Sequence, residues 1–364
     1  MKKKLSSLLA VIMVALLCLT ACNSTPPAAS APESAPPQDA DVTEETAVPV
    51  DPITFVTSTS QKPGAATQLL QLKISEVNDE LGGGNFLFEH YDSATLFKSS
   101  AEPGALMDGE IDIGYIQLGY FADNGAKWAS MFDIAYAFDS VEEMMDILSD
   151  ENEVGQWVQQ KLYEELHVWA ISPFFLGTRN IWIRNDIDVN TPADVAGMKI
   201  RMPNSNSFLE LGAALNTAPT PLDSSETYLA MQTGTVDAQE NITSSSYANA
   251  MQEVSKTIVK TEHMITANMI CVNGDVWDSM TPERQQLLTE IIKRAATENN
   301  EKVIADEEAI LAECESLGIR IQEPDKEAFK ENAINYYLSK PENIEIWDAE
   351  YFKLLTGIEL ELKN

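Results

Sequence analysis

Basic side chains are scarce in this chain: 24 Lys and Arg stand against 57 Asp and Glu in 364 residues, a formal net charge of −33. A nucleic-acid-binding protein displaces counterions from phosphates with clustered Lys and Arg, and the sequence has no such basic stripe. We therefore exclude nucleic acid as a partner. Because so acidic a protein repels anions at long range, any anion-binding site must be local and built from specific donors.

Motifs typical of enzymes are also missing. The sequence contains no Walker A loop and no GxSxG, HExxH or CxxC motif, each of which positions a phosphate, a nucleophile or a metal ion. Its three histidines, His90, His167 and His263, show no spacing typical of metal ligands. We predict a protein that is not an enzyme and needs no cofactor or metal.

Long apolar runs are absent except near the N-terminus. Three lysines at positions 2 to 4 precede the apolar segment Leu5–Leu19, which is short for a membrane span and typical of a secretory signal. The segment ends in Leu19-Thr20-Ala21-Cys22, which resembles the lipobox of bacterial lipoproteins. We predict that residues 1–21 are a lipoprotein signal peptide and that Cys22 is lipidated, anchoring an extracytoplasmic protein to the membrane. The alternative is a plain secretory signal with an incidental cysteine.

Residues 22–50 have a composition that cannot form a core. They are rich in Pro, Ala, Ser, Thr, Asp and Glu and contain no aromatic residue, so we predict a flexible tether. Removal of the three leader lysines leaves 21 basic and 57 acidic residues, a net charge of −36. The remaining chain of roughly 310 residues is too long for one small core and is typical of two domains.

Cysteine is rare, with four residues in the whole chain. After processing, Cys271 and Cys314 remain, and a disulfide between them is one option in an oxidising compartment. Cys271 lies in the apolar run MITANMICV, which favours a second interpretation, a small buried core residue.

Strand patterns alternate with helix patterns along the rest of the chain. Strand-like segments at Ile53–Thr57, Phe86–Tyr91 and Ile111–Ile116 are separated by segments with apolar residues at helical spacing. This order predicts an α/β fold with a mostly parallel sheet. Two further short strands are expected at Val168–Ile171 and Ile181–Ile183, with a break at Pro173.

A long helix is predicted near the C-terminal end. Thr281 is a suitable N-cap, and Pro282 suits the first helical position. Helical spacing then continues to about Leu317 without an internal Gly or Pro. Such a helix is roughly 50 Å long, which is enough to cross two domains.

The stretch Thr191–Asn241 holds the strongest candidate site. A short capped helix begins at Thr191-Pro192-Ala193-Asp194, and the strand Met198–Met202 follows, with Arg201 near its end. Ligands of α/β sheets gather beyond the carboxyl ends of strands, and a guanidinium matches a carboxylate in shape and charge. Arg201 is therefore a candidate anion-binding residue; the alternative is an internal ion pair.

Other polar residues in or near this stretch are also candidates. Arg179 precedes the strand Ile181–Ile183 and is either a ligand contact or one partner of a salt bridge. Asn241 follows Gln239-Glu240 and either bonds a ligand or shapes a turn. Asp223 and Glu226 have the spacing of a capping box, so we predict a structural role for Glu226.

Taken together, these segments resemble the solute-binding proteins of TRAP transporters, the tripartite ATP-independent periplasmic systems. Ala238 and Ile242 stand where that family often has Gly and Pro. The resemblance rests on Gly177-x-Arg179, Thr191–Pro203, Pro219–Leu222, Glu226–Gly234 and Val236–Asn241, with weaker matches at 104–114 and in the long helix.

The resemblance implies a periplasmic-binding-protein-like fold of two α/β lobes, each a mostly parallel sheet flanked by helices, with the long helix spanning both. We expect residues 51–176 and 267–305 to form the first lobe, and residues 177–266 and 306–364 the second. By resemblance, Arg201 pairs with the carboxylate of a small organic acid, and Arg179, Asn241 and Asn204 add contacts. The lobes close on the acid, and membrane permease subunits receive it.

Three other functions are weighed against this one. A receptor that reports to a membrane sensor kinase has the same sequence features, and genes for a permease or a kinase nearby distinguish the two. A secreted hydrolase on a similar scaffold is disfavoured by the missing motifs. The receptor of an ATP-driven transporter is disfavoured by the motif set. The sequence does not identify the acid.

Overall fold

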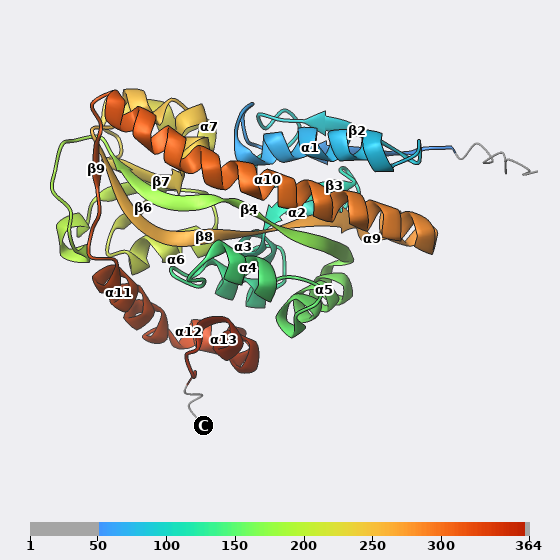
Figure 1. The fold of residues 1–364 in the computed structure, drawn as a ribbon. Helices are drawn as coiled ribbons and strands as arrows, with labels where there is room; N and C mark the ends of the chain where they lie inside the picture. The colour runs from blue at the N-terminus through green and yellow to red at the C-terminus, as the bar shows by residue number, and fades with distance from the viewer. Residues whose placement is uncertain (1–50, 361–364) are drawn as a thin grey trace, which may run out of the picture. The chain divides into compact units, whose positions relative to one another are not determined.

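The computed structural model describes residues 51–360 (Figure 1), and these residues form one compact unit. The predicted signal peptide 1–21, the lipidation site Cys22 and the tether 22–50 lie outside the described residues. The strands are β1 (Ile53–Ser58), β2 (Phe86–Tyr91), β3 (Ile113–Gln117), β4 (Val168–Ile183), β5 (Lys199–Met202), β6 (Ala218–Pro221), β7 (Ala238–Ile242), β8 (Thr257–Asn273) and β9 (Arg320–Gln322).

Helices follow most of these strands, as the alternating pattern predicted. The α-helices are α1 (Ala66–Leu81), α2 (Glu102–Met107), α3 (Leu118–Ala122), α4 (Val141–Ile147), α5 (Glu153–Leu166), α6 (Asn206–Ala214), α7 (Ser224–Thr233), α8 (Thr243–Ala248), α9 (Gly274–Asp278), α10 (Pro282–Ser316), α11 (Lys326–Leu338), α12 (Pro341–Ile346) and α13 (Ala349–Thr356). Short 3₁₀ helices are η1 (Lys127–Asp133), η2 (Pro192–Val195) and η3 (Met251–Glu253).

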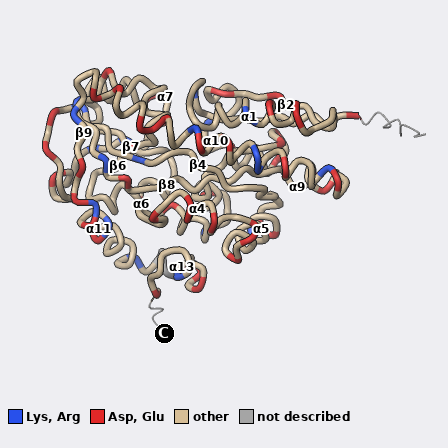
Figure 2. Tube along the Cα trace, viewed as in Figure 1, with Lys and Arg blue, Asp and Glu red and all other residues tan. Residues whose placement is uncertain are grey.

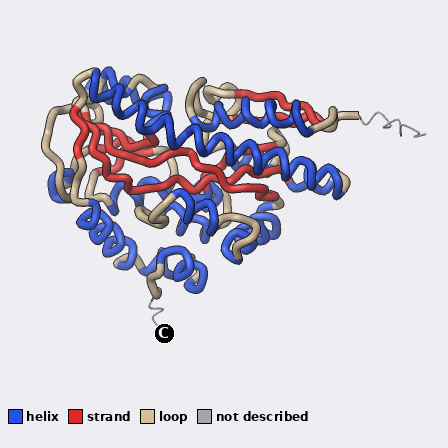
Figure 3. Tube along the Cα trace, viewed as in Figure 1, coloured by secondary structure: helices blue, strands red, loops and turns tan. Residues whose placement is uncertain are grey.

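The strands of the described chain form one sheet with helices on both sides (Figure 3). Its order is β2-β1-β3-β8-β4-β7-β5-β6, and β9 pairs with β8. The long strands β4 and β8 are antiparallel to each other. β1 is parallel to β2 and β3, and β5 is parallel to β6 and β7. The fold is therefore α/β with two mostly parallel groups of strands, as predicted.

The two long strands connect the two groups, which are the two lobes. The β3 strand pairs with β8 at residues 268–272, and β7 pairs with β4 at residues 179–183. Each group thus joins the β4–β8 pair at a different end. Both lobes share one continuous sheet, and the chain passes between them without a separate linker.

The predicted strand break at Pro173 is wrong. β4 runs without interruption from Val168 to Ile183, and Pro173 pairs with Met269 of β8. Proline interrupts a ladder because it has no N–H to donate. Here β7 reaches only residues 179–183 of β4, so Pro173 lies where β4 is paired on one side, and bulges on either side of it adjust the register.

The long helix is confirmed as α10, with 35 residues. The Thr281 hydroxyl caps it by accepting a hydrogen bond from the Arg284 amide at 3.4 Å. α10 packs against α1 in the first lobe, and against α8 and β9 in the second. At 1.5 Å per residue it is roughly 50 Å long, so a single rigid element touches both lobes.

Both remaining cysteines are free and buried, so the disulfide is absent and the core interpretation of Cys271 is correct. Cys271 on β8 belongs to the main apolar cluster, whereas Cys314 near the end of α10 belongs to a smaller cluster with Trp182 and Met231. The two thiols lie in different packing environments, and burial raises the pKa of each of them.

The C-terminal helices contact earlier parts of the chain. Tyr351 of α13 stacks on Trp157 of α5 with ring centroids 4.4 Å apart, and the Trp347 indole donates a hydrogen bond to Ser130. Acidic residues are distributed over the whole described chain (Figure 2). Within residues 51–360, no helix combines the length and apolarity that crossing a bilayer requires.

Candidate functional site

A cleft of about 360 Å³ lies between the two lobes. One wall comes from the loops after β1 and β2, the start of α2, β3 and α3, with Asn268 of β8. The other comes from β4, β5 and the segment after it, α6, the start of α7, β7 and α8. The four predicted site residues all lie in this second wall, namely Arg179, Arg201, Asn204 and Asn241.

Arg201 is a buried cation of the cleft. Its side chain is buried, and its Nε donates to the carbonyl oxygen of Leu222 at 2.9 Å. Among the described residues, no carboxylate forms an ion pair with it. Burial lowers the pKa of Arg201 to about 10, which still leaves the guanidinium charged at neutral pH. A buried charge without a partner is unfavourable, so an anion in the cleft gains an unusually strong contact.

Arg179 has the opposite character, because its charge is compensated within the protein. Its Nε and Nη2 donate to the two carboxylate oxygens of Glu240 at 2.6 and 2.8 Å, and its guanidinium lies 4.6 Å from the centre of the Phe208 ring. The salt bridge, one of the two interpretations from the sequence, is therefore present, although Arg179 also lines the cleft.

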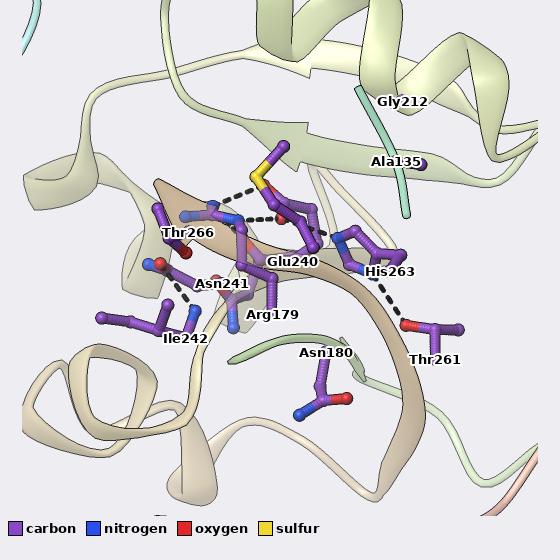
Figure 4. A network of polar contacts seen from close by, with 12 residues as sticks. Ala135, Arg179, Asn180, Gly212, Glu240, Asn241, Ile242, Thr261, His263 and Thr266 are labelled. Carbon is purple, nitrogen blue, oxygen red and sulfur yellow. Dashed lines mark hydrogen bonds and ion pairs between the residues drawn. The ribbon is translucent and has the colours of Figure 1, made fainter. Parts of the chain in front are cut away.

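Glu240 connects Arg179 to a buried histidine (Figure 4). Its second contact is His263, whose Nε2 lies 3.2 Å from Glu240 Oε2, and Thr261 Oγ1 lies 2.8 Å from His263 Nδ1. Burial alone would raise the pKa of Glu240, but the Arg179 charge and the His263 contact outweigh it and lower the pKa to about 2. His263, which showed no role in the sequence, thus helps to fix Arg179.

Asn241 and Asn204 complete the predicted group. The Asn241 side-chain oxygen accepts a hydrogen bond from the Ile242 amide at 2.9 Å, which orients the side chain at the end of β7 (Figure 4). Asn204 lies just after β5 and is exposed. Glu226 is a helix-capping residue, as predicted, because it forms a capping box with Asp223 at the start of α7.

Sequence reasoning missed the first wall of the cleft. The loop after β1 contributes Thr59, Ser60 and Gln61, and α2 contributes Glu102. The rule that led to Arg201 also applies to this loop, since it follows the carboxyl end of a strand. Glu102 had no sequence signal: the Ser58 hydroxyl donates to its Oε1 at 3.1 Å, and burial raises its pKa to about 8.

One ion pair crosses from wall to wall. Lys98, in the loop before α2, pairs with Asp223 at the N-terminus of α7. The Lys98 side chain is 63% exposed, so solvent and salt weaken the pair. It nevertheless shows that the loops of the two lobes come within contact distance at this edge of the cleft.

Comparison with known proteins identifies the family. Residues 57–342 match bacterial extracellular solute-binding protein, family 7. The sialic acid-binding periplasmic protein SiaP of Vibrio cholerae is 25% identical over 273 residues, covering 74% of this chain and 83% of SiaP. The C4-dicarboxylate-binding periplasmic protein DctP of Rhodobacter capsulatus is 26% identical, covering 64% of this chain and 70% of DctP.

A solved structure agrees with the sequence matches. A TRAP periplasmic solute-binding protein from Roseobacter denitrificans, with bound 3-deoxy-D-manno-oct-2-ulosonic acid, superposes with a TM-score of 0.79 and 26% identity. The match covers 84% of this chain and 99% of that protein. All of these relatives are described as binding proteins rather than as enzymes. This chain therefore belongs to family 7 of the bacterial extracellular solute-binding proteins, the periplasmic receptors of TRAP transporters.

Proposed function

We propose that this receptor captures a sugar acid in the cleft and delivers it to the membrane permease subunits of a TRAP transporter. The observation that carries the proposal is Arg201, a buried guanidinium that faces the cleft without an ion-pair partner among the described residues. A ligand carboxylate provides the missing charge. Arg179, Asn241 and Asn204 border the same space and supply further donors.

The remainder of the cleft favours a ligand with hydroxyl groups. Its lining consists mainly of hydroxyl and amide side chains, such as Ser60, Gln61, Asn249 and Asn268, and apolar side chains are few. Such side chains both donate and accept hydrogen bonds, as a polyhydroxylated ligand requires. A short apolar acid would leave many of them without a partner.

The ligands of the relatives fall into two classes. The Vibrio cholerae relative is named for sialic acid and the Roseobacter denitrificans structure holds an eight-carbon sugar acid, whereas the Rhodobacter capsulatus relative is named for C4-dicarboxylates. Their sequence identities to this chain are nearly equal, so identity does not choose between these classes. The polar lining of this cleft favours the sugar acids.

Closure of the two lobes would make the contacts stronger. We assign residues 51–176 and 267–305 to the first lobe and residues 177–266 and 306–364 to the second, with α13 returning to contact α5. A ligand that bridges both walls binds the closed form better and shifts the population toward it. We further propose that Cys22 carries a lipid anchor, which keeps the receptor beside the permease.

Calorimetric titration of a panel of sugar acids and dicarboxylates tests the proposal. Removing one partner of a buried charge pair costs about 2–5 kcal/mol, so Arg201→Ala should weaken binding at least about thirtyfold. Lys199→Ala is the matched control, because Lys199 lies on the same strand and is exposed. The proposal fails if the Arg201→Ala protein, with an unchanged circular dichroism spectrum, binds the acids as well as the wild type.

A further inference from the structure

Two carboxylic acids line the cleft, and their surroundings differ. Asp223 pairs with Lys98 and caps the N-terminus of α7. Glu102 lies in the opposite wall, at the start of α2, and is 5% exposed. Among the described residues, no lysine, arginine or histidine forms an ion pair with Glu102. It is the acid of the cleft whose charge the protein leaves uncompensated.

The contacts of Glu102 leave part of its hydrogen-bonding capacity free. The Ser58 hydroxyl donates to Oε1 at 3.1 Å, and the Ser60 backbone amide also interacts with the carboxyl group. A carboxylate offers about four acceptor positions, so about two remain. Because the side chain lines the cleft, these positions are open to a ligand.

A second acceptor lies in the same wall. The side-chain oxygen of Asn268, on β8, is buried and has no hydrogen-bond partner among the described residues. Buried polar atoms are normally satisfied, so an orphan acceptor in a binding cleft indicates a donor on the ligand. Both Glu102 and Asn268 can accept hydrogen bonds from O–H or N–H groups of a ligand.

Two buried ionisable side chains lie in opposite walls of the cleft. Among the described residues, Arg201 in the second lobe has no ion-pair partner, and Glu102 in the first lobe has no cation beside it and keeps acceptor positions free. Under the proposed function, the carboxylate at one end of the ligand binds Arg201. The end that meets the first lobe must be rich in donors.

We propose that Glu102, together with Asn268, binds the hydroxyl groups of the ligand at the end remote from its carboxylate, and that ionised Glu102 disfavours acids with a second carboxylate at that end. This inference rests on the proposed function and names the discriminating residue. Hydroxyl donors to a carboxylate form charge-assisted hydrogen bonds. When Glu102 is ionised, a second carboxylate instead brings like charges together in a place with little solvent, which selects against dicarboxylic acids.

Aldonic and aldaric acids form ligand pairs that isolate this effect. Gluconate and glucarate, or galactonate and galactarate, differ only at C6, where one has a CH₂OH group and the other a carboxylate. Because burial raises the pKa of Glu102 to about 8, binding is measured at roughly pH 9, where the group is charged. We expect wild-type protein to prefer each aldonate by at least about tenfold.

The Glu102→Gln variant is the decisive one. It keeps the size of the side chain and removes its charge, so the preference for the aldonate should fall to less than about threefold, chiefly because the aldarate binds better. Glu89→Gln, which removes an exposed acid of β2 outside the cleft, should keep the wild-type preference. If Glu102→Gln does not fold, Ser58→Ala removes the hydroxyl that orients Glu102 and should weaken aldonate binding several-fold.

The outcomes separate this inference from the proposed function. If wild-type protein binds aldarates or succinate at least as well as aldonates, and Arg201→Ala abolishes that binding, the role of Glu102 is wrong while the carboxylate anchor stands. An aldonate preference that survives in Glu102→Gln also overturns the inference. If wild-type protein binds no acid of either class, the proposed function fails and the inference fails with it.

Discussion

Two buried arginines show how the same residue type takes different tasks. Arg179 and Arg201 are equally inaccessible, each 3% exposed, and both border the cleft. Glu240 neutralises Arg179 with two hydrogen bonds, whereas Arg201 bonds only to a backbone oxygen. The difference comes from a single neighbouring carboxylate. Of the two arginines, Arg201 is therefore the one available to bind an anion.

The salt bridge makes a prediction about stability. Glu240→Gln leaves Arg179 buried without a counterion and removes the charge that His263 contacts. Breaking a buried pair in this way destabilises a protein by about 3–5 kcal/mol. Urea unfolding should show this loss, and Glu226→Gln, at an exposed helix cap, should change the unfolding free energy far less. A loss below about 1 kcal/mol in Glu240→Gln would mean that Arg179 finds another partner.

At this scale the sequence predicted residues of one wall of the cleft. Arg201 was predicted from a general rule about strand ends, Arg179 and Asn241 were candidates with two interpretations each, and the resemblance favoured ligand contacts for both and added Asn204. Glu102, Asn268 and His263 were missed because their importance comes from burial and from neighbours distant in sequence. In a chain with 57 Asp and Glu residues, the local sequence does not indicate which carboxyl group will be buried.

The elements that matter most for function are those shared by both lobes, β4, β8 and α10. Helix α10 was predictable from its caps and uninterrupted spacing. The full lengths of β4 and β8 were not, because Pro173 is a local stop signal whose effect depends on which side of the strand is paired. The carboxyl group of Glu307 on α10 accepts a hydrogen bond from the Thr178 amide at 2.7 Å, so helix and strand meet where the lobes join.

Gly177 lies at this junction and should not tolerate a side chain. Its φ is +136°, and an added Cβ would lie 3.0 Å from Glu307 Oε1 and from the Ile242 side chain. We predict that Gly177→Ala destabilises the protein by about 1–3 kcal/mol, measured as a lower midpoint in thermal unfolding. Gly104→Ala, within α2, where an added Cβ would make only an ordinary contact 3.8 Å from Asn124 Oδ1, should instead be neutral or stabilising by up to about 1 kcal/mol. Equal effects of the two substitutions on stability would contradict the strain predicted for Gly177→Ala.

For the molecule as a whole, acidity affects stability as well as ligand choice. Burial raises the pKa of three enclosed carboxyl groups, to about 8 for Glu102 and about 7 for Asp133 and Glu307. These pKa values lie above the ordinary values of 4.5 for Glu and 3.8 for Asp. In the interval between, the folded state holds protons that the unfolded state has already released.

The ligand-free protein should therefore become less stable as the pH rises from about 5 to about 8, because the folded state binds more protons than the unfolded state over that range. His90 and His263, whose pKa burial lowers, act in the opposite direction, but they are two groups against three. Thermal unfolding at a fixed, moderate salt concentration, which screens surface repulsion, measures the slope. Glu307→Gln should flatten it, since the amide has no proton to lose, and Glu76→Gln, at an exposed position of α1, should not. A stability that rises steadily over this interval would contradict the prediction.

The shared strands β4 and β8 have a consequence for how the chain reaches its native state. One of the two partners of β3 in the sheet is β8, which lies about half the described chain further on. No N-terminal fragment that stops before β8 can complete the first lobe, and such long-range pairings make folding slow. The two lobes therefore cannot fold one after the other as independent units. The strand order is completed only once the chain through β8 is present, and both lobes should unfold in a single calorimetric transition.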